Sequence, residues 1–498
     1  MTAVVLIPAA AVAFALTQTH VGARLTGAPT AAAANRAAAP APAPAGPIET
    51  AVQFGAQAGY EGMIADRIRA ANATKVRLNV RWTNIAPAVR PAGFKASDPG
   101  EPAYNWGGLD QALRAITAKG LTPFVTVFDG PLWAEQGKGE AESHLGDLKP
   151  NVAALSAFAT AIARRYAGGY AGLPRVRYWQ VWNEPNVTVY LRPQFVGGRL
   201  AAPRLYTQMV NAFARSVHAV RADNKVIAGG MSPFTLRAGD IHTVAPLRFM
   251  RELLCMSSGP KPRRTCRTTI EFDIWAHHPY TSGDASHSAE RPDDVSLGDM
   301  GEMKTLLDAA VRAGQVRHRQ PVDFWVTEFG WDSSPPDPRG VPVRIHARWV
   351  AEAVYRMWQV GVKVISWHQL RDTPFPEQNF QAGLYALGPG GRPESDRPKP
   401  ALAAFRFPFV AYRDARAIRV WGLAPGRKRT TVVIERGSAG AWRRLATLKS
   451  NRYGIFSGTF EVPSTAAEFV RARVAGAPPA LPFSLRPVPD RRVNPFGT

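Results

Sequence analysis

Two glutamates follow short apolar runs in this sequence. The run YWQVW at residues 178–182 precedes Asn183 and Glu184, and the run WVT at residues 325–327 precedes Glu328. A single glutamate after a strand is usually solvated or paired for structural reasons. Two glutamates that follow different strands, with both strand ends at the same open face of the fold, are harder to explain in that way. Two carboxyl groups can divide acid and base work when their environments hold one protonated and the other ionised.

Such a pair needs a scaffold that brings strand ends together, and the sequence predicts one. From residue 49 to 405, β-branched or aromatic runs alternate with amphipathic stretches, which is typical of βα units in a parallel sheet. The fold class expected is therefore α/β, a (β/α)₈ TIM barrel, whose open face is formed at the C-terminal ends of the strands. The eight predicted strands are residues 51–54, 75–80, 122–128, 175–182, 225–229, 271–277, 322–329 and 362–367.

Helices are expected in most of the gaps between these strands. In the stretch after residue 151, Val152, Leu155, Phe158 and Ile162 fall on one helical face. Similar patterns predict helices at residues 110–119, 206–221, 300–313 and 345–360.

The motifs around both glutamates resemble those of clan A glycoside hydrolases, which include cellulases, β-xylosidases and endoglycoceramidases. The WNEP motif at 182–185 matches the clan's acid/base motif, and the TEFG motif at 327–330 matches its nucleophile strand. The resemblance covers most of residues 49–405. It implies that Glu184 is the acid/base and Glu328 the nucleophile, with carboxyl groups about 5–5.5 Å apart as in retaining enzymes. It also implies that Asn183 bonds the sugar 2-hydroxyl, the alternative being a cap of the following loop.

Strand two contains an arginine within an apolar run, and a buried charge needs a partner. Arg77 matches the clan's strand-two arginine, and Glu328 is its expected partner, which would keep the nucleophile ionised. Arg81 is the competing choice and is expected at the rim.

Strands six and eight supply further expected contacts. The HPY motif at 278–280 resembles the clan's His-x-Tyr, so His278 and Tyr280 are predicted to line the site, with Tyr280 contacting Glu328. His277 is expected to be a packed neighbour. Adjacent strand residues point to opposite faces, so a metal site formed by both histidines is not expected. Trp367 is predicted to be an aromatic platform for the sugar, with plain core packing as the alternative.

Two further residues are candidates for the site. Asp129 and Trp133, which follow strand three, are candidates for the cleft lining. No metal and no cofactor are implied by the motifs.

The chain of 498 residues can form one large domain or two to three smaller ones. Hydrophobic residues make up 46% and charged residues 20%, the balance of a soluble globular protein. The formal net charge is +23. Residues 406–498 hold 17 Lys and Arg against 5 Asp and Glu, so the charge is spread along the chain. This distribution argues against nucleic acid as a partner and leaves an acidic wall polymer or membrane surface open.

Composition divides the chain into four predicted parts. Residues 1–26 contain an apolar run and are expected to be a signal peptide or, because no Lys or Arg precedes that run, an N-terminal anchor. Residues 27–48 are an Ala/Pro-rich linker, and residues 49–405 are the barrel. After residue 398 short alternating strands and no helix are expected. Residues 406–498 therefore predict a small all-β sandwich domain.

The chain has two cysteines, Cys255 and Cys266, in one segment between strands five and six. In an exported chain a local disulfide is expected, and two free thiols are the alternative.

The leading hypothesis is a secreted retaining O-glycoside hydrolase that cleaves a β-linked glycan or glycoconjugate, with an oligo- or polysaccharide as its partner. A transglycosylase with the same site is one alternative. A noncatalytic cell-wall-binding protein that uses the basic surface is another.

Overall fold

The computed structural model describes residues 46–55, 57–136, 147–238, 241–414, 416–438, 441–461, 469–488 and 491–493. The predicted export segment and most of the predicted linker lie outside these residues. Among the described residues, no helix combines the length and apolar character needed to cross a membrane.

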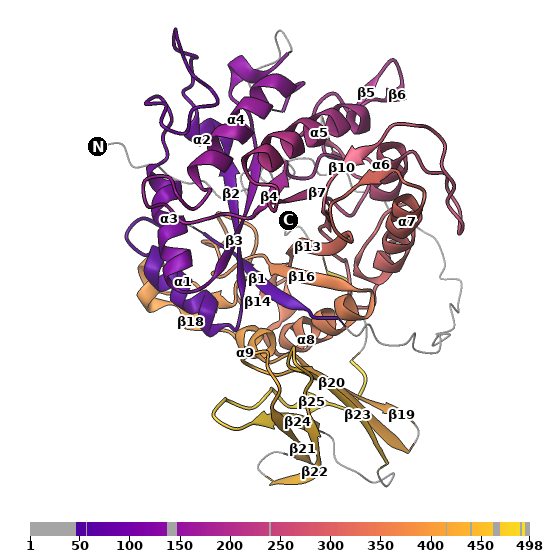
Figure 1. The fold of residues 1–498 in the computed structure, drawn as a ribbon. Helices are drawn as coiled ribbons and strands as arrows, with labels where there is room; N and C mark the ends of the chain where they lie inside the picture. The colour runs from indigo at the N-terminus through magenta and orange to yellow at the C-terminus, as the bar shows by residue number, and fades with distance from the viewer. Residues whose placement is uncertain are drawn as a thin grey trace.

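Eight parallel strands close into a barrel, as the sequence predicted (Figure 1). Each strand pairs with its neighbours in chain order, and the first strand pairs with the last, Glu49 opposite Val364. The strands are β1 (Glu49–Gln53), β2 (Lys75–Arg81), β3 (Thr122–Phe128), β4 (Tyr178–Val181), β7 (Lys225–Met231), β11 (Ile274–His277), β13 (Asp323–Phe329) and β16 (Val362–Trp367).

Helices surround the barrel on the outside (Figure 1), and all five predicted helices are present. Sequence periodicity missed four, α1, α2, α6 and α9. The last of these contradicts the expectation of no helix after residue 398; it begins with Pro400, which is favourable in the first helical turn. The helices are α1 (Glu61–Ala70), α2 (Trp82–Ile85), α3 (Gly107–Ala118), α4 (Val152–Arg165), α5 (Ala202–Val220), α6 (Pro246–Leu254), α7 (Met300–Arg312), α8 (Val343–Gln359) and α9 (Pro400–Arg406).

Strand alternation sorts side chains into a barrel interior and an outer layer. A separate interior cluster includes Phe124, Ile274, Trp325 and Val364, while outward residues pack with the helices. On β2 the inward positions are polar, and Arg77 lies there fully buried. The interior is thus apolar at its base and polar toward the mouth, which positions charged groups for chemistry.

Short strands and turns lie in the loops and at the ends of helices. They are β5 (Phe195–Val196), β6 (Arg199–Leu200), β8 (Arg237–Ala238), β9 (Ile241–His242), β10 (Ile270–Glu271), β12 (Val316–Arg317), β14 (Ser333–Ser334), β15 (Val341–Pro342), β17 (Tyr385–Ala386) and β18 (Arg397–Pro398), with 3₁₀ turns at Leu132–Ala134, Leu297–Asp299, Pro389–Gly391 and Pro393–Ser395.

The C-terminal part forms antiparallel sheets beside the barrel (Figure 1). Trp421 is buried and packs against Tyr355 and Trp358 of α8, with ring centroids 5.2 and 5.3 Å apart. Its role is therefore packing against the barrel. One sheet has the order β19 (Phe409–Asp414), β20 (Ala417–Leu423), β23 (Ile455–Glu461), and the other has the order β22 (Ala441–Lys449), β21 (Thr431–Ser438), β24 (Phe469–Val474), β25 (Phe483–Ser484).

Cys255 and Cys266 form a disulfide, with their Cα atoms 5.1 Å apart. Cys255 ends α6, and the bridge lies between β7 and β11, so the predicted pairing is confirmed.

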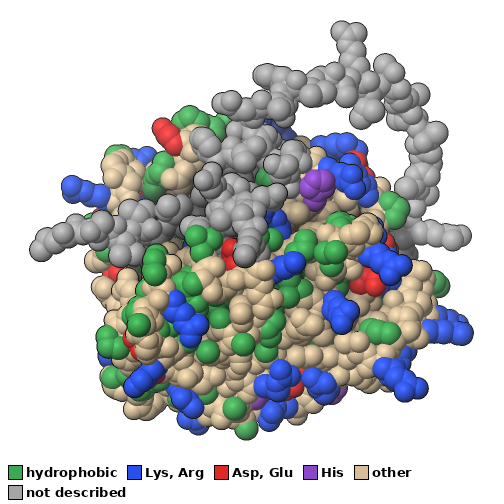
Figure 2. Space-filling view, turned by 90° about the horizontal axis from the view of Figure 1, so that it is seen from above, with side chains coloured by type: hydrophobic (Ala, Val, Ile, Leu, Met, Phe, Trp, Pro, Cys, Tyr) green, Lys and Arg blue, Asp and Glu red, His purple; other side chains and the backbone are tan. Residues whose placement is uncertain are grey.

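Lys and Arg side chains are scattered over the face of the molecule seen in Figure 2, where they outnumber Asp and Glu and do not gather in one stripe. This distribution agrees with the spread of charge along the sequence.

Candidate active site

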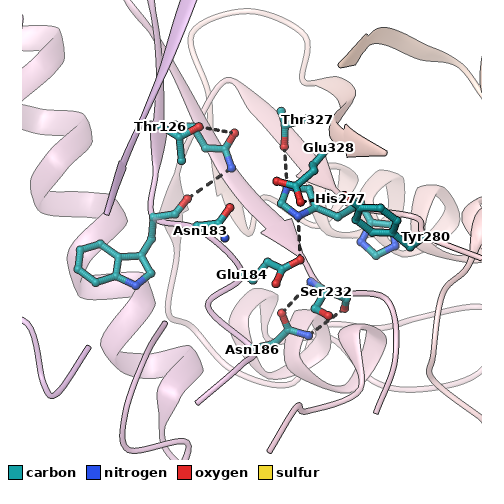
Figure 3. Close-up of polar contacts among 12 residues, drawn as sticks. Thr126, Asn183, Glu184, Asn186, Ser232, His277, Tyr280, Thr327 and Glu328 are labelled. Atoms are coloured by element: carbon teal, nitrogen blue, oxygen red, sulfur yellow. Dashed lines mark hydrogen bonds and ion pairs between the residues drawn. The ribbon is translucent and has the colours of Figure 1, made fainter. Parts of the chain in front are cut away.

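Glu184 and Glu328 meet at the mouth of the barrel from strands on different sides. Glu184 follows β4 by three residues, and Glu328 is the sixth residue of β13. Figure 3 shows the two side chains near each other, with Asn183 on one side and Tyr280 on the other. One carboxylate oxygen of each, together with a ring nitrogen of His278, lie within 4.8 Å of one another.

The Glu328 carboxylate is held by the groups that the sequence predicted to contact it. Arg77 forms an ion pair with one oxygen, and the Tyr280 hydroxyl donates to the other at 2.9 Å. Burial alone would raise the pKa of Glu328. The neighbouring His368 imidazole and the Arg77 guanidinium outweigh burial and hold that pKa well below its usual range. Glu328 is therefore ionised at neutral pH.

Arg77 also links β13 to the Glu184 loop. Its Nη2 donates to the Asn183 side-chain oxygen at 2.8 Å, and its Nε donates to Thr126 at 3.3 Å. Gln53 of β1 accepts from its Nη1 at 3.2 Å. Every donor group of the buried guanidinium thus has a partner, as a buried charge requires.

Glu184 has the opposite electrostatic environment. Burial and the nearby negative charge of Glu328 raise the pKa of Glu184 well above its usual range, and Arg77 only partly offsets this. Two buried carboxyl groups with pKa values pushed apart are the arrangement expected of an acid and a nucleophile.

His278 contacts Glu184 rather than Glu328. Its Nδ1 lies 2.9 Å from a Glu184 oxygen, and its Nε2 lies 3.1 Å from the Thr327 hydroxyl. Burial lowers the pKa of His278 well below its usual range, so the ring is neutral. His277 is also fully buried, and its Nε2 hydrogen bonds to the Val295 carbonyl at 2.8 Å, which confirms it as a packed neighbour.

The chain around Glu184 is pinned in an uncommon backbone conformation. Trp182 and Glu184 have positive φ angles of 69° and 38°. Such angles persist when surrounding contacts enforce them. The Glu184 N–H donates to the Gly230 carbonyl at 3.0 Å, and Asn186 exchanges hydrogen bonds with the Ser232 backbone at 3.0 Å (Figure 3).

Gly230 of β7 is required by this close packing. Its φ is +65°, and a Cβ at that position would lie 2.3 Å from Gln180 Nε2. A side chain there would displace the polar residues that line the site.

The structure contradicts the prediction that Trp367 is a sugar platform. Its indole is 1% exposed, packs against Phe329 and Phe405, and donates to the Ala382 carbonyl at 2.7 Å. Trp367 points out of the barrel into the helix layer. His368, one residue later, is also buried, and its imidazole is one of the groups that lower the pKa of Glu328.

The other candidates lie at the rim. Arg81 forms an ion pair with Asp129 at 3.2 Å, which confirms the rim position expected for this arginine. Burial raises the pKa of Asp129 to about 7, despite Arg81. Trp133 donates to the Pro87 carbonyl at 2.8 Å and packs on Phe94, so its indole N–H holds a loop together.

Several residues of the site were not anticipated from the sequence. Polar residues within apolar strands were the available signal for Gln53, Thr126, Gln180 and Thr327. Tyr190 gave no such signal because it lies in a loop. Burial and the charges of Glu184 and Glu328 raise the pKa of its hydroxyl well above the usual range.

A cavity of about 580 Å³ adjoins the mouth between β1, β2, α3 and the loop after β16. The residues lining it include Gln53, Asn79, Arg81 and Gln369 but neither catalytic candidate. One of its lining residues, Gln53, accepts a hydrogen bond from Arg77, which pairs with Glu328.

The donor set fits proton transfer better than metal binding. Glu184, His278 and Glu328 could offer three ligand atoms to an ion. A cation there would be repelled by Arg77, which already pairs with Glu328, and it would break the bond between His278 and Glu184.

No protein-family model and no curated protein matches the chain by sequence. Among solved structures, a family 39 glycoside hydrolase from Bacteroides cellulosilyticus WH2 is similar, with TM-score 0.50 and 14% identity over 84% of this chain and 81% of that one. A glucosidase from Croceicoccus marinus (TM-score 0.44, 15% identity, 85% of this chain, 98% of that one) and a β-glycosidase from Thermosphaera aggregans (0.45, 16%, 70% and 84%) also match. The first of these matches shows that the chain shares the barrel fold of a glycoside hydrolase, which agrees with the predicted (β/α)₈ barrel.

Proposed function

We propose that this protein is a retaining O-glycoside hydrolase that cleaves a β-linked glycan or glycoconjugate. Glu328 is the nucleophile and Glu184 the acid/base. The observation that carries this proposal is the pair of carboxyl groups in one mouth whose pKa values shift in opposite directions. A nucleophile must be ionised and a general acid protonated at the start of the same cycle.

In the first step Glu328 attacks the anomeric carbon and forms a covalent bond to it. The glycosidic C–O bond breaks, its electron pair goes to the leaving oxygen, and Glu184 gives that oxygen its proton. In the second step water attacks the anomeric carbon while ionised Glu184 takes the water proton. The Glu328 ester bond breaks, and both carboxyl groups return to their starting states.

The spacing of the carboxyl groups supports retention of configuration. One oxygen of Glu184 and one of Glu328 lie within 4.8 Å of each other, whereas an inverting enzyme needs carboxyl groups about 6.5–9.5 Å apart to admit water between them.

The residues around the two glutamates also have roles in this proposed reaction. Arg77 and Tyr280 stabilise ionised Glu328 before it attacks. Arg77 occupies the Asn183 oxygen, which leaves the amide NH₂ to bond the sugar 2-hydroxyl. We infer that His278 donates from Nδ1 to one Glu184 oxygen, so that the other oxygen carries the proton for the substrate.

The remaining predictions about the chain are part of the same proposal. A disulfide between Cys255 and Cys266 favours an oxidising compartment, which supports export. We propose a division into residues 49–405 and 406–498. The second part is proposed to form one sandwich, in which apolar residues of both sheets, such as Val420 and Ile434, share a core.

The test is a screen of aryl glycosides and wall polysaccharides with the full chain and with Glu328→Ala. The proposal predicts release of a reducing sugar or phenol by the native protein and background rates for the variant. Equal rates for both proteins would overturn it.

A further inference from the structure

The exposed large apolar side chains of the described residues lie in loops at one end of the barrel. Among the described residues they are Val89, Leu132, Phe195, Val196 and Phe375, with exposures from 36% to 81%. Each lies in a loop that follows a barrel strand: β2, β3, β4 or β16. These loops form the open face that holds Glu184 and Glu328. Isolated apolar residues are common on protein surfaces, and here all five of those in the described residues follow barrel strands at the mouth.

Two of these residues lie next to each other on the β5–β6 hairpin. Phe195 and Val196 are 38% and 58% exposed, and the tip continues through two glycines to Arg199. Figure 1 shows the hairpin projecting beside α5. Its base is fixed, because Gln194 donates to the Pro185 carbonyl at 2.8 Å and the Leu191 carbonyl at 2.7 Å. The hairpin is thus a firmly held part of the Glu184 loop.

The apolar tips are flanked by positive charge. Arg248 lies over the Phe195 ring at 5.7 Å, and Arg90 lies over Trp133 at 5.6 Å. In the described parts of the loops after β2, β3 and β4, each acidic residue is buried or half-buried. The exposed cations of these loops and of the start of α6 are Arg90, Lys95, Lys149, Arg199 and Arg248. We call Val89, Leu132, Phe195 and Val196 with these cations the apolar rim.

We propose that the apolar rim docks on an anionic lipid surface and that the substrate is a glycolipid whose lipid is the leaving group. Exposed apolar side chains flanked by Lys and Arg are the chemistry that binds an anionic bilayer interface. The net charge of +23 adds long-range attraction to such a surface.

The position of the β5–β6 hairpin in the Glu184 loop indicates which part of the substrate is the lipid. A general acid protonates the leaving oxygen, so the leaving group lies against Glu184. The hairpin belongs to the same loop as Glu184 and is pinned to it through Pro185. A sugar reaching Glu328 thus has its lipid at the apolar rim. The substrate assignment rests on the proposed hydrolase function, whereas the docking does not.

Docking is tested by co-sedimentation of the full chain with phosphatidylcholine vesicles, with and without phosphatidylglycerol. The native protein should bind the anionic vesicles and bind neutral vesicles more weakly. The double variant Phe195→Ser/Val196→Ser should bind about tenfold more weakly, because two apolar side chains no longer enter the interface. Arg199→Gln should also weaken binding. The matched control is Arg319→Gln, which removes an exposed charge at the opposite end of the barrel and should bind like the native protein.

The substrate part needs a second readout. The rate on a β-glycolipid embedded in anionic vesicles, divided by the rate on a soluble aryl glycoside of the same sugar, should fall in the Phe195/Val196 variant. Failure of the native protein to bind anionic vesicles, or equal loss in the Arg319 control, would overturn the docking. Binding to vesicles with no turnover of any glycoside would leave docking supported and overturn the glycolipid assignment together with the hydrolase proposal.

Discussion

The Arg77 guanidinium pairs with the Glu328 carboxylate across the barrel, between β2 and β13, which are not neighbouring strands. The arginine side chain is fully buried and the glutamate side chain is 13% exposed. The same arginine bonds Asn183 beside Glu184. Arg77 therefore helps His368 to keep Glu328, the proposed nucleophile, ionised, and it also holds a residue next to Glu184, the proposed acid.

Replacing Arg77 by Met should raise the pKa of Glu328, since burial is then no longer offset by the Arg77 charge and hydrogen bond. The acidic limb of the kcat/KM profile should move to higher pH, because Glu328 must lose its proton to act. Breaking one partner of a buried ion pair should also cost about 3–5 kcal/mol of stability. Urea unfolding and pH–rate profiles test both effects, with Arg77→Lys as the charge-retaining control. A folded Met variant with an unmoved acidic limb would contradict this role.

Replacing Glu184 by Ala should slow substrates with poor leaving groups by about 10²–10⁴-fold. Activated aryl glycosides should lose much less, because their leaving oxygens need little protonation. Added azide should restore turnover and give a glycosyl azide of unchanged anomeric configuration. Equal losses on both substrate types, measured by initial rates, would remove Glu184 from the acid role.

The basic limb of the kcat/KM profile should report Glu184. Its raised pKa keeps the acid protonated above the range of an ordinary carboxyl group, so activity should persist to higher pH and fall once Glu184 ionises. In Glu184→Gln, activity on an activated aryl glycoside should lose this basic limb and keep the acidic one. A basic limb that survives unchanged would assign it to another group.

Much of the barrel and the central site could be predicted from residue order alone. Strand alternation and the motifs around Glu184 and Glu328 indicated both strand ends, and the arginine inside β2 needed a charged partner. At the end of β16 the platform prediction for Trp367 was wrong and its alternative, core packing, was right, because the neighbouring His368 is the residue that acts on Glu328. Trp367 and His368 are adjacent, so a single step decides which one faces the mouth and which faces the helices. Sequence alone could not make that choice.

Other misses have local causes. The helix α9 has seven residues, which is too few for a helical period to be recognised. Tyr190 comes near Glu184 through the path of a loop. Loop paths depend on tertiary contacts, such as the Trp182 indole bonding the Tyr190 carbonyl at 2.5 Å.

Replacing Trp367 by Ala should destabilise the protein by about 3–5 kcal/mol, the cost of a cavity in a packed core. Trp367→Phe should recover much of that loss, and its KM for a small aryl glycoside should stay close to that of the native protein. Chemical denaturation and steady-state kinetics measure the two effects. A large rise in KM in a stably folded Phe variant would return Trp367 to the sugar site.

The most direct test of the central claim is an NMR time course of the anomeric proton in the first product released from a β-glycoside that the protein cleaves. Double displacement through Glu328 inverts the anomeric carbon twice, so the β-anomer should form first and the α-anomer should appear only later by mutarotation. An α-anomer as the first product would mean a single displacement by water. That result would contradict Glu328 as a covalent nucleophile.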